Sequence, residues 1–385
     1  MNNIDQIFVL LKQAILNISG AFLPDWLLTL VSILVSITAI AILGPFTMMY
    51  LTLLERKVIG RMQNRPGPNR VGKWGLLQPF ADGIKMLTKE DIVPLNADPV
   101  VHFLAPILIV IPALLVFAVI PFGRNMTPVD LNVGLLFFIA VSSTTTIAIF
   151  MASWGSRNKF SILGGFRSAA QMISYEIPMV LSVVPVILMT GSLSTNDIVL
   201  AQGGWGGLKW FVFTPWGLFA FMIFFLCGVA ECNRSPFDLP EGESEIVAGF
   251  HTEYSGMKFA LFYMAEFMNS FTVSGLAATL FLGGWQGPFL PSWIWFFLKT
   301  YALIFVMIWF RGTLPRVRVD QMMGLAWKFL LPLTLVNILV AGFWYFANGP
   351  LRIGGSILIL GLAFWIFTKL NSKYMPEKRV YQFGE

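Results

Sequence analysis

The first long uncharged stretch of the chain, residues 26–54, limits its possible folds more than any other feature. It contains 29 residues without a single Asp, Glu, Lys or Arg. At a rise of about 1.5 Å per residue, a helix of this length exceeds a hydrocarbon core of roughly 30 Å. We therefore predict a tilted transmembrane helix here.

Eight further stretches have the length and composition of membrane-crossing helices. They are residues 103–120, 133–153, 169–189, 216–230, 259–282, 293–310, 329–346 and 353–368. The last is short, and it spans a bilayer only if the flanking Arg352 and Lys369 reach outward to the headgroups. Pro178, Pro185 and Pro332 fall inside or near these stretches and predict kinks, which membrane helices tolerate.

The composition agrees with a membrane protein. Hydrophobic residues make up 56% of the chain. Charged residues make up 12%, against about 25% in ordinary soluble domains. A soluble enzyme, a coiled coil, a disordered chain and a disulfide scaffold are thereby excluded. The uncharged stretches also lack the alternating polarity of membrane β-strands.

We therefore predict an all-α, polytopic membrane helix bundle with long structured cytoplasmic loops. It has eight core transmembrane helices over residues 26–346, a ninth C-terminal helix and an N-terminal amphipathic helix, all in one integral membrane domain (1–385). Residues 350–385 supply the extra helix and a basic tail. Residues 1–24 form an interfacial helix, because their apolar side chains share one helical face and no basic start marks a signal peptide. The apolar face consists of Ile4, Ile7, Phe8, Leu11, Ile15 and Ile18.

The basic residues are distributed asymmetrically between the two sides of the predicted membrane. With nine crossings and an outer N-terminus, 21 Lys and Arg residues fall inside and five fall outside. The positive-inside rule predicts that the N-terminus is periplasmic or outer and that the C-terminus is cytoplasmic. The formal charge of +6 is therefore mostly an orientation signal, whereas nucleic-acid binding needs a soluble basic face.

One inside segment, residues 231–253, is acidic and breaks this pattern. It carries six carboxylates against one arginine, Arg234, and one histidine. A solvated acidic loop is the simplest interpretation, but interleaved apolar residues such as Phe237 and Leu239 favour burial. Burial of clustered carboxylates raises some of their pKa values towards neutrality, which suits proton carriers. The six are Glu231, Asp238, Glu241, Glu243, Glu245 and Glu253.

Two further carboxylates lie inside predicted transmembrane helices. Glu176 follows Arg167 by nine residues, and Glu266 follows Lys258 by eight, so both lie at a similar depth from the same side. A carboxylate buried in a membrane is costly and is a functional-site candidate. The alternative is a neutral glutamate that satisfies a kinked backbone. Two carboxylates at matching depth below an acidic loop favour a proton path.

Two basic inside segments complete the candidate site. Residues 55–91 place Glu55 and Asp82 beside basic residues, and paired charges at a membrane boundary often line a polar cavity. Residues 311–321 either anchor the chain to headgroups or face the acidic segment or a polar ligand. Two cysteines and two histidines cannot supply a four-thiolate cluster and leave little for zinc or haem. No phosphate-binding loop, dinucleotide motif or nucleophile triad occurs in the sequence.

Taken together, these motifs resemble the H-type membrane subunit family of the proton-pumping NADH:quinone oxidoreductase, respiratory complex I. The resemblance covers residues 53–333, and the long acidic motif is its most specific mark. Members usually have eight membrane helices, so the N-terminal helix and the ninth helix are departures. The matching motifs are residues 55–57, 67–69, 76–82, 174–176 and 231–245, Tyr254, residues 265–266, Arg311, and residues 315–316 and 320–321.

The resemblance implies a membrane subunit of a proton-translocating quinone reductase that is not catalytic alone. It implies that this subunit forms most of the quinone chamber and that a glutamate path couples quinone reduction to proton translocation. The residues implied at the chamber are Glu55, Arg56, Asp82, Arg311 and Arg316. Those implied for the proton path are Glu176, Glu231, Glu241, Glu243, Glu245 and Glu266, with Arg167, Tyr175 and Arg234 as neighbours.

The resemblance also implies that the cofactors lie on other chains. Quinone is the substrate, no metal or flavin is expected on this chain, and partner subunits hold the iron–sulfur cluster and FMN. The implied partners are the terminal iron–sulfur cluster subunit, the peripheral subunit of the quinone site, the small membrane subunits A, J and K, and lipid, with no nucleic acid. The implied location is the inner (plasma) membrane.

Other functions stay open at this point. The chain could anchor a related membrane-bound hydrogenase, although the complete acidic run at residues 241–245 argues against it. It could also belong to a complex I-like enzyme fed by ferredoxin or F420. A proton-coupled transporter acting alone is a third alternative, which the missing internal repeat and the apolar inside loops disfavour. A purely structural anchor is the fourth.

Overall fold

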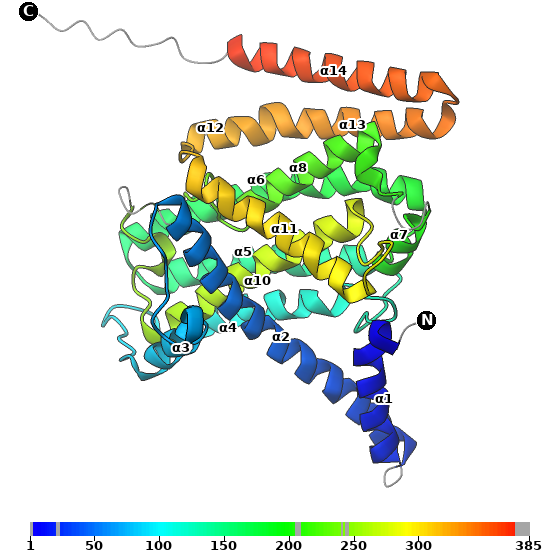
Figure 1. The fold of residues 1–385 in the computed structure, drawn as a ribbon. Helices are drawn as coiled ribbons and strands as arrows, with labels where there is room; N and C mark the ends of the chain where they lie inside the picture. Colours follow the sequence, from blue (N-terminus) through cyan, green and yellow to red (C-terminus); the bar gives the residue numbers. More distant parts are fainter. Residues whose placement is uncertain (1–2, 21–23, 205–208, 240–241, 243–245, 374–385) are drawn as a thin grey trace, which may run out of the picture.

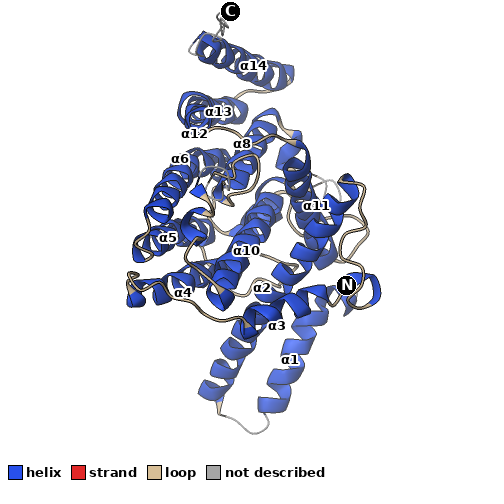
Figure 2. Ribbon diagram, turned by 90° about the vertical axis from the view of Figure 1, so that its left-hand side faces the viewer, coloured by secondary structure: helices blue, strands red, loops and turns tan. Residues whose placement is uncertain are grey.

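The computed structural model describes residues 3–20, 24–204, 209–239, 242 and 246–373. Within these ranges the regular structure is helical, and no strand occurs (Figure 2). The α-helices are α1 (Ile7–Gly20), α2 (Asp25–Met62), α3 (Gln78–Thr88), α4 (Pro99–Leu115), α5 (Gly134–Gly155), α6 (Lys159–Thr190), α7 (Thr195–Ala201), α8 (Pro215–Glu231), α10 (Gly256–Phe281), α11 (Ser292–Thr313), α12 (Val319–Gly324), α13 (Leu331–Phe346) and α14 (Pro350–Lys373).

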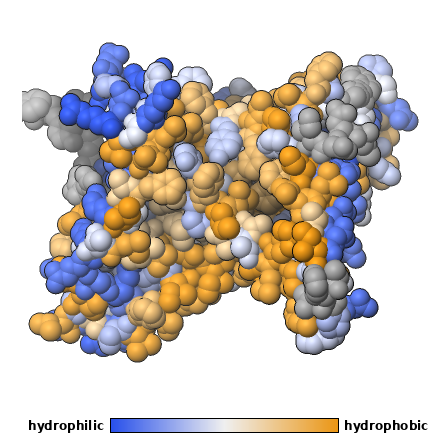
Figure 3. Space-filling model, turned by 60° about the horizontal axis from the view of Figure 1, so that its bottom comes forward, coloured by the Kyte–Doolittle hydropathy of each residue, from blue (hydrophilic) through white to orange (hydrophobic). Residues whose placement is uncertain are grey.

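Each of the nine predicted crossings coincides with a helix of the described chain, which confirms the all-α membrane bundle. Among the described residues, seven helices are both long and apolar enough to cross a bilayer: Asp25–Met62, Pro99–Val119, Gly134–Gly155, Lys159–Thr190, Ser292–Thr313, Val319–Phe346 and Pro350–Leu370. Figure 3 shows hydrophilic residues at the two ends of one face and a hydrophobic band between them. Helices are favoured in such a band because they satisfy every backbone polar group internally.

The two remaining crossings, α8 and α10, lie inside the bundle. Helix α8 has 17 residues, and α10 has 26. Helix α10 packs against α2, α4, α8 and α11, and nearly all its residues from Phe267 to Phe281 are buried. Because its surroundings are protein rather than lipid, it tolerates serines, Asn269 and Glu266 among its apolar residues.

The N-terminal segment, a 3-10 turn (Asn3–Gln6) followed by α1, contacts two spanning helices. The Ser292 amide at the start of α11 donates to Asp5 Oδ1 over 2.6 Å, and Lys12 Nζ donates to Ser36 Oγ of α2 over 2.8 Å. In Figure 1, α1 (dark blue) runs across the direction of α13 and α14. The predicted apolar face is exposed from Ile7 to Ile18. Its placement in the membrane interface stays a prediction.

The C-terminal helices form an outer layer, with α14 packed on α13 (Figure 1). Helices α12 and α13 are joined by a π-helical segment, Leu325–Leu330, directly before Pro332. Proline has no N–H for the helical ladder, which accounts for the shifted hydrogen bonds before it. The two cations predicted to flank residues 353–368 lie within α14, each over an indole: Arg352 is 4.2 Å from the Trp344 ring, and Lys369 is 4.9 Å from the Trp365 ring.

Three connections meet at one end of the bundle, on the left in Figure 1, where α3 lies. They follow α2, α8 and α11. The backbone amide of Val317, after α11, donates to Pro236 O, after α8, over 3.1 Å. The Ser255 hydroxyl likewise joins the start of α10 to Glu90 and Ile92, which follow α3. The segments predicted to carry the chemistry are thus adjacent in space.

Candidate functional site

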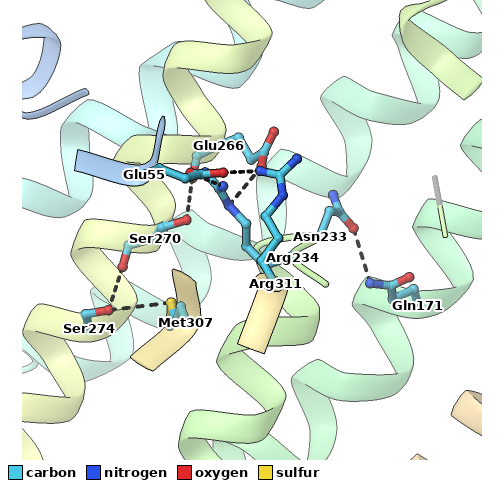
Figure 4. A network of polar contacts seen from close by, with 9 residues as sticks. All are labelled: Glu55, Gln171, Asn233, Arg234, Glu266, Ser270, Ser274, Met307 and Arg311. Atoms are coloured by element: carbon cyan, nitrogen blue, oxygen red, sulfur yellow. Dashed lines mark hydrogen bonds and ion pairs between the residues drawn. The ribbon is translucent and has the colours of Figure 1, made fainter. Parts of the chain in front are cut away.

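The centre of the site is Arg234, in the connection that follows α8. Its guanidinium forms ion pairs with Glu55 Oε2 of α2 at 2.6 Å and with Glu266 Oε1 of α10 at 3.0 Å. It also lies over the Phe267 ring, 4.1 Å from the centroid. Figure 4 shows both carboxylates directed at this group. One buried arginine therefore links a residue predicted for the quinone chamber to one predicted for the proton path.

Local geometry brings Arg234 into this position. Helix α8 ends at Glu231, and Asn233 then takes a left-handed conformation with φ of 50°. The Arg234 amide donates back to Val229 O over 3.2 Å, so the chain turns inward rather than leaving the bundle. Burial alone would lower the pKa of the Arg234 guanidinium, but the Glu266 and Glu55 carboxylates raise it above its ordinary value. The side chain is therefore a permanent cation.

Glu55 binds two arginines, one with each carboxylate oxygen. Arg311, at the end of α11, donates to Oε1, while Arg234 donates to Oε2. With Glu266 the cluster holds two cations and two carboxylates, which balances the charge that burial would otherwise make costly. A cavity of about 20 Å³ lies against Glu55, Arg234 and Arg311 and is otherwise lined mainly by apolar side chains such as Leu51 and Ile304.

The remaining residues predicted for the chamber are Arg56 and Asp82, which pair with each other, and Arg316, which contacts the acidic segment. Arg56 of α2 forms an ion pair with Asp82 of α3, and Gln78 Nε2 donates to Asp82 Oδ1 over 3.1 Å. Arg316 Nη2 donates to Leu239 O over 3.1 Å. The second basic segment therefore faces the acidic one, as one of the two interpretations of the sequence required.

Glu176 and Glu231 lie on the opposite side of the site, next to α5. Glu176 of α6 accepts a hydrogen bond from the Ser143 hydroxyl of α5. Glu231, at the end of α8, is 8% exposed and lies beside Ser142 and close enough to Glu176 for their charges to interact. Its Oε2 atom has no hydrogen-bond partner among the described residues. These two carboxylates and the two serines form a second polar group.

A cavity of about 30 Å³ separates the two polar groups. Glu231 and Glu266 both line it, together with Asn233, His251 and Asn269. A cavity with several polar groups and this volume has room for at least one water molecule. The two predicted path residues are therefore not in direct contact, but they share one cavity.

The other residues predicted for the path are placed less directly. The Tyr175 hydroxyl donates to Met322 O of α12 over 3.0 Å. Arg167 is partly buried on α6, two turns before Tyr175. Glu241, Glu243 and Glu245 lie outside the described residues.

Three residues of the site were absent from the sequence prediction: Gln171, Ser142 and Ser143. Gln171 is fully buried on α6, and its amide donates to Ala230 O over 2.7 Å and to Phe237 O over 2.8 Å. It thereby fixes the turn that carries Arg234. The serines belong to five consecutive hydroxyl residues, 142–146, and this run inside an apolar stretch is a signal that could have found them.

Within the described ranges, no three His, Cys, Asp or Glu residues are grouped so that they could hold a metal ion. Cys227 and Cys232 are free and buried. Burial and the nearby Glu231 raise the pKa of the Cys232 thiol, so it is a neutral side chain. The described side chains of the site are mainly carboxylates, arginines and hydroxyls.

Comparison with known proteins gives this geometry a context. A family model described as NADH dehydrogenase matches residues 34–342. The chain is 54% identical over 290 residues to the H subunit of the NADH-quinone oxidoreductase of Dehalococcoides mccartyi, covering 75% of this chain and 80% of the relative. It is 53% identical over 303 residues to H subunit 1 of the same enzyme in Geobacter metallireducens, covering 76% and 90%. It is 48% identical over 320 residues to H subunit 2 of Koribacter versatilis, again covering 76% and 90%. Helices α1 and α14 lie outside the residues that the family model matches.

Proposed function

The chain belongs to the NADH dehydrogenase family, and from this premise we propose that it is the membrane subunit that couples quinone reduction to proton translocation in complex I. Its relatives are named as the H subunit of NADH-quinone oxidoreductase, which favours this function over a hydrogenase anchor. The observation that carries the proposal is the position of Arg234 between Glu55 and Glu266.

The Glu55 end of the cluster is the proposed quinone end. A quinone headgroup has carbonyl oxygens that accept hydrogen bonds, and Arg56, Arg311 and Arg316 are donors near the connections that partner subunits would cover. Arg311 is 34% exposed at its side chain, so part of its guanidinium is available to a ligand. The Arg56–Asp82 pair on α2 and α3 is more open still. These residues support a chamber that partner subunits complete.

The Glu266 end is the proposed start of the proton path. When negative charge develops at the quinone, Arg311 is drawn towards it and away from Glu55. Glu55 then depends more strongly on Arg234, and Glu266 loses part of the cation that stabilises its ionised form. A carboxylate that loses a nearby cation binds protons more readily, which is the required coupling.

From Glu266 the path continues through the shared cavity to Glu231 and then to Glu176. Water in a polar cavity of this size can carry a proton between two carboxylates that do not touch. We place Glu241, Glu243 and Glu245 on this path from the sequence motif, with Arg167 and Tyr175 nearby. The small membrane subunits A, J and K are the proposed next partners.

The proposed partners also supply the redox groups. Quinone is the substrate of the assembled enzyme, and the iron–sulfur cluster and FMN lie on peripheral subunits. The distribution of 21 basic residues inside and five outside supports an outer N-terminus and a cytoplasmic C-terminus in the inner membrane. The peripheral subunits then cover the end where Arg234 lies.

Replacement of the buried glutamates tests this function. We expect Glu176→Gln and Glu266→Gln to leave the complex assembled and to lower coupled quinone reduction at least tenfold, because a neutral amide cannot carry a proton. Asp197→Asn is the matched control, since Asp197 accepts from Ser192 near α7, at the other end of the bundle. NADH-driven quinone reduction and proton uptake would be measured in vesicles that contain the whole complex. Full turnover and pumping in both glutamate variants would refute the proton path.

A further inference from the structure

Helix α5 carries five consecutive hydroxyl residues, 142–146, in its membrane-spanning part. Serine and threonine hydroxyls within helices commonly donate to a carbonyl one turn earlier, which satisfies them locally. Thr144 and Thr145 follow this rule, since they donate to Val141 O and Ser142 O over 2.7 Å. Ser142 and Ser143 differ, because each also lies against a carboxylate of a neighbouring helix.

The Ser143 hydroxyl has one proton and two acceptors. Its Oγ is 2.9 Å from Ile139 O and is also within hydrogen-bond distance of Glu176 Oε1. When Glu176 is ionised, Ser143 donates to the carboxylate. When Glu176 is protonated, the carboxylic acid donates to Ser143 Oγ, and the serine proton turns to Ile139 O.

Ser142 has the same choice with a different carboxylate. Its Oγ is 3.0 Å from Ile139 O, and its hydroxyl also lies beside Glu231. Glu231 has an Oε2 atom without a hydrogen-bond partner in the described part of the chain, so it gains when Ser142 turns towards it.

Both serines therefore compete for one carbonyl. A carbonyl oxygen has two lone pairs, and the regular ladder of α5 already uses Ile139 O for the amide of Ser143. In the structure both hydroxyls lie within hydrogen-bond distance of this oxygen, so they share the one acceptor position that the ladder leaves. When Ser143 occupies it, Ser142 is directed to Glu231, and when Ser142 occupies it, Ser143 is directed to Glu176.

We propose that Ser142 and Ser143 are positioning residues that form a hydroxyl switch, through which Glu176 and Glu231 hold one proton between them. A proton that binds Glu176 turns Ser143 to Ile139 O, which turns Ser142 to Glu231 and stabilises its ionised form. Glu231 then releases its proton into the cavity it shares with Glu266. The reverse transfer follows the same steps backwards, and no other reactant is needed. This inference rests on the proposed proton path and adds the hydrogen-bond change that couples proton uptake at Glu176 to proton release at Glu231.

The switch predicts the protonation of Glu231 in a variant of Glu176. In Glu176→Gln the new amide donates to Ser143 Oγ as a protonated carboxyl would, so we expect Glu231 to be ionised in this variant. Adding Ser142→Ala to Glu176→Gln removes the hydroxyl that stabilises ionised Glu231. The proton-binding constant of Glu231 should then rise about tenfold, which is the effect of one hydrogen bond to a charged group. Glu176→Gln with Thr144→Val is the control, because Thr144 is exposed and donates to Val141 O of its own helix.

Infrared spectroscopy of the assembled complex would measure this. A carboxylic acid band should appear in Glu176→Gln with Ser142→Ala but not in Glu176→Gln with Thr144→Val, and it is assigned to Glu231 by its loss when Glu231→Gln is added. Ser142→Thr restores the hydroxyl and should restore the ionised form, which separates the switch from loss of packing. An unchanged Glu231 band with Ser142→Ala would overturn the switch. This readout is independent of pumping, so loss of the proton path in the glutamate variants and failure of the switch are distinguishable outcomes.

Discussion

Arg234 and Lys299 are both buried cations in this membrane bundle, but their partners differ in kind. Arg234 pairs with two carboxylates from different helices. Lys299 of α11 donates to three backbone carbonyls, Leu282 O at 2.6 Å, Gly284 O at 2.8 Å and Gln286 O at 2.7 Å. Its ammonium is also 4.4 Å from the Trp210 ring.

The difference shows how one bundle combines a fixed end with an adjustable end. Backbone carbonyls cannot gain or lose a charge, so the three acceptors of Lys299 do not change with protonation, and the site joins α11 to the connection after α10. Carboxylates can bind protons and exchange arginine partners, so the arrangement of the Arg234 cluster can respond to a change in protonation or charge. Coupling needs the second kind of site, because two discrete arrangements must be biased by a distant event.

The largest effect is expected when the adjustable end loses its central cation. Arg234→Gln leaves Glu55 with Arg311 alone and Glu266 without its ion pair to Arg234. Breaking a buried ion pair from one side costs about 3–5 kcal/mol, so we expect little assembled complex and no coupled turnover. Blue-native electrophoresis and quinone-dependent NADH oxidation would measure both.

Arg234→Lys is the control for this change, since lysine keeps the charge but can bind the two carboxylates less well. We expect it to assemble and to retain a fraction of the turnover. Normal assembly and turnover of Arg234→Gln would show that the cluster does not link the proposed quinone chamber to the proposed proton path.

A smaller effect of a different kind is expected at the fixed end. Lys299→Met keeps the volume of the side chain but leaves three buried carbonyls without their donor. We expect a loss of about 2 kcal/mol in stability, seen as a lower unfolding temperature of the complex. Turnover per assembled complex should stay unchanged, because Lys299 touches neither cavity.

Lys299→Arg, which restores a donor, should recover part of this stability. A specific loss of coupled turnover in Lys299→Met, at normal stability, would contradict the division of the bundle into two kinds of end.

The sequence predicted the parts of this site but not their connections. Long uncharged runs determine spanning helices, because the bilayer allows few alternatives, and so the nine crossings were found. Charged residues within or beside such runs are rare, and so Glu55, Glu176, Glu231, Glu266 and Arg311 were singled out. Arg234 was assigned only as a neighbour of the path, because pairing with Glu55, 179 residues away, depends on how the helices pack.

Hydroxyl groups were missed for a related reason. Serine and threonine are common in membrane helices and usually bond their own backbone, so the run at 142–146 marks a polar stretch of one helix but does not identify Glu176 and Glu231 as its neighbours. The unusual bond of Ser143 to Glu176 is a property of two helices together. Charge is therefore predictable from the sequence, whereas the path between charges is a tertiary feature.

The smallest effect on stability is expected at the exposed pair of Arg56 and Asp82, which tests whether the charge pairs of this end act alike. Their side chains are 48% and 27% exposed, so solvent screens them, and such a pair contributes about 0–1 kcal/mol. Asp82→Asn should therefore leave assembly and the unfolding temperature nearly unchanged.

The same variant should still raise the KM for quinone a few-fold, because Arg56 would lose the partner that orients it at the proposed chamber, while kcat changes less. Gln78→Ala, which removes only the 3.1 Å bond to Asp82, is the milder control on the same helix. Quinone titrations of the whole complex decide the matter, since an unchanged KM with Asp82→Asn would confine the quinone end to the buried Glu55–Arg311 side of the cluster.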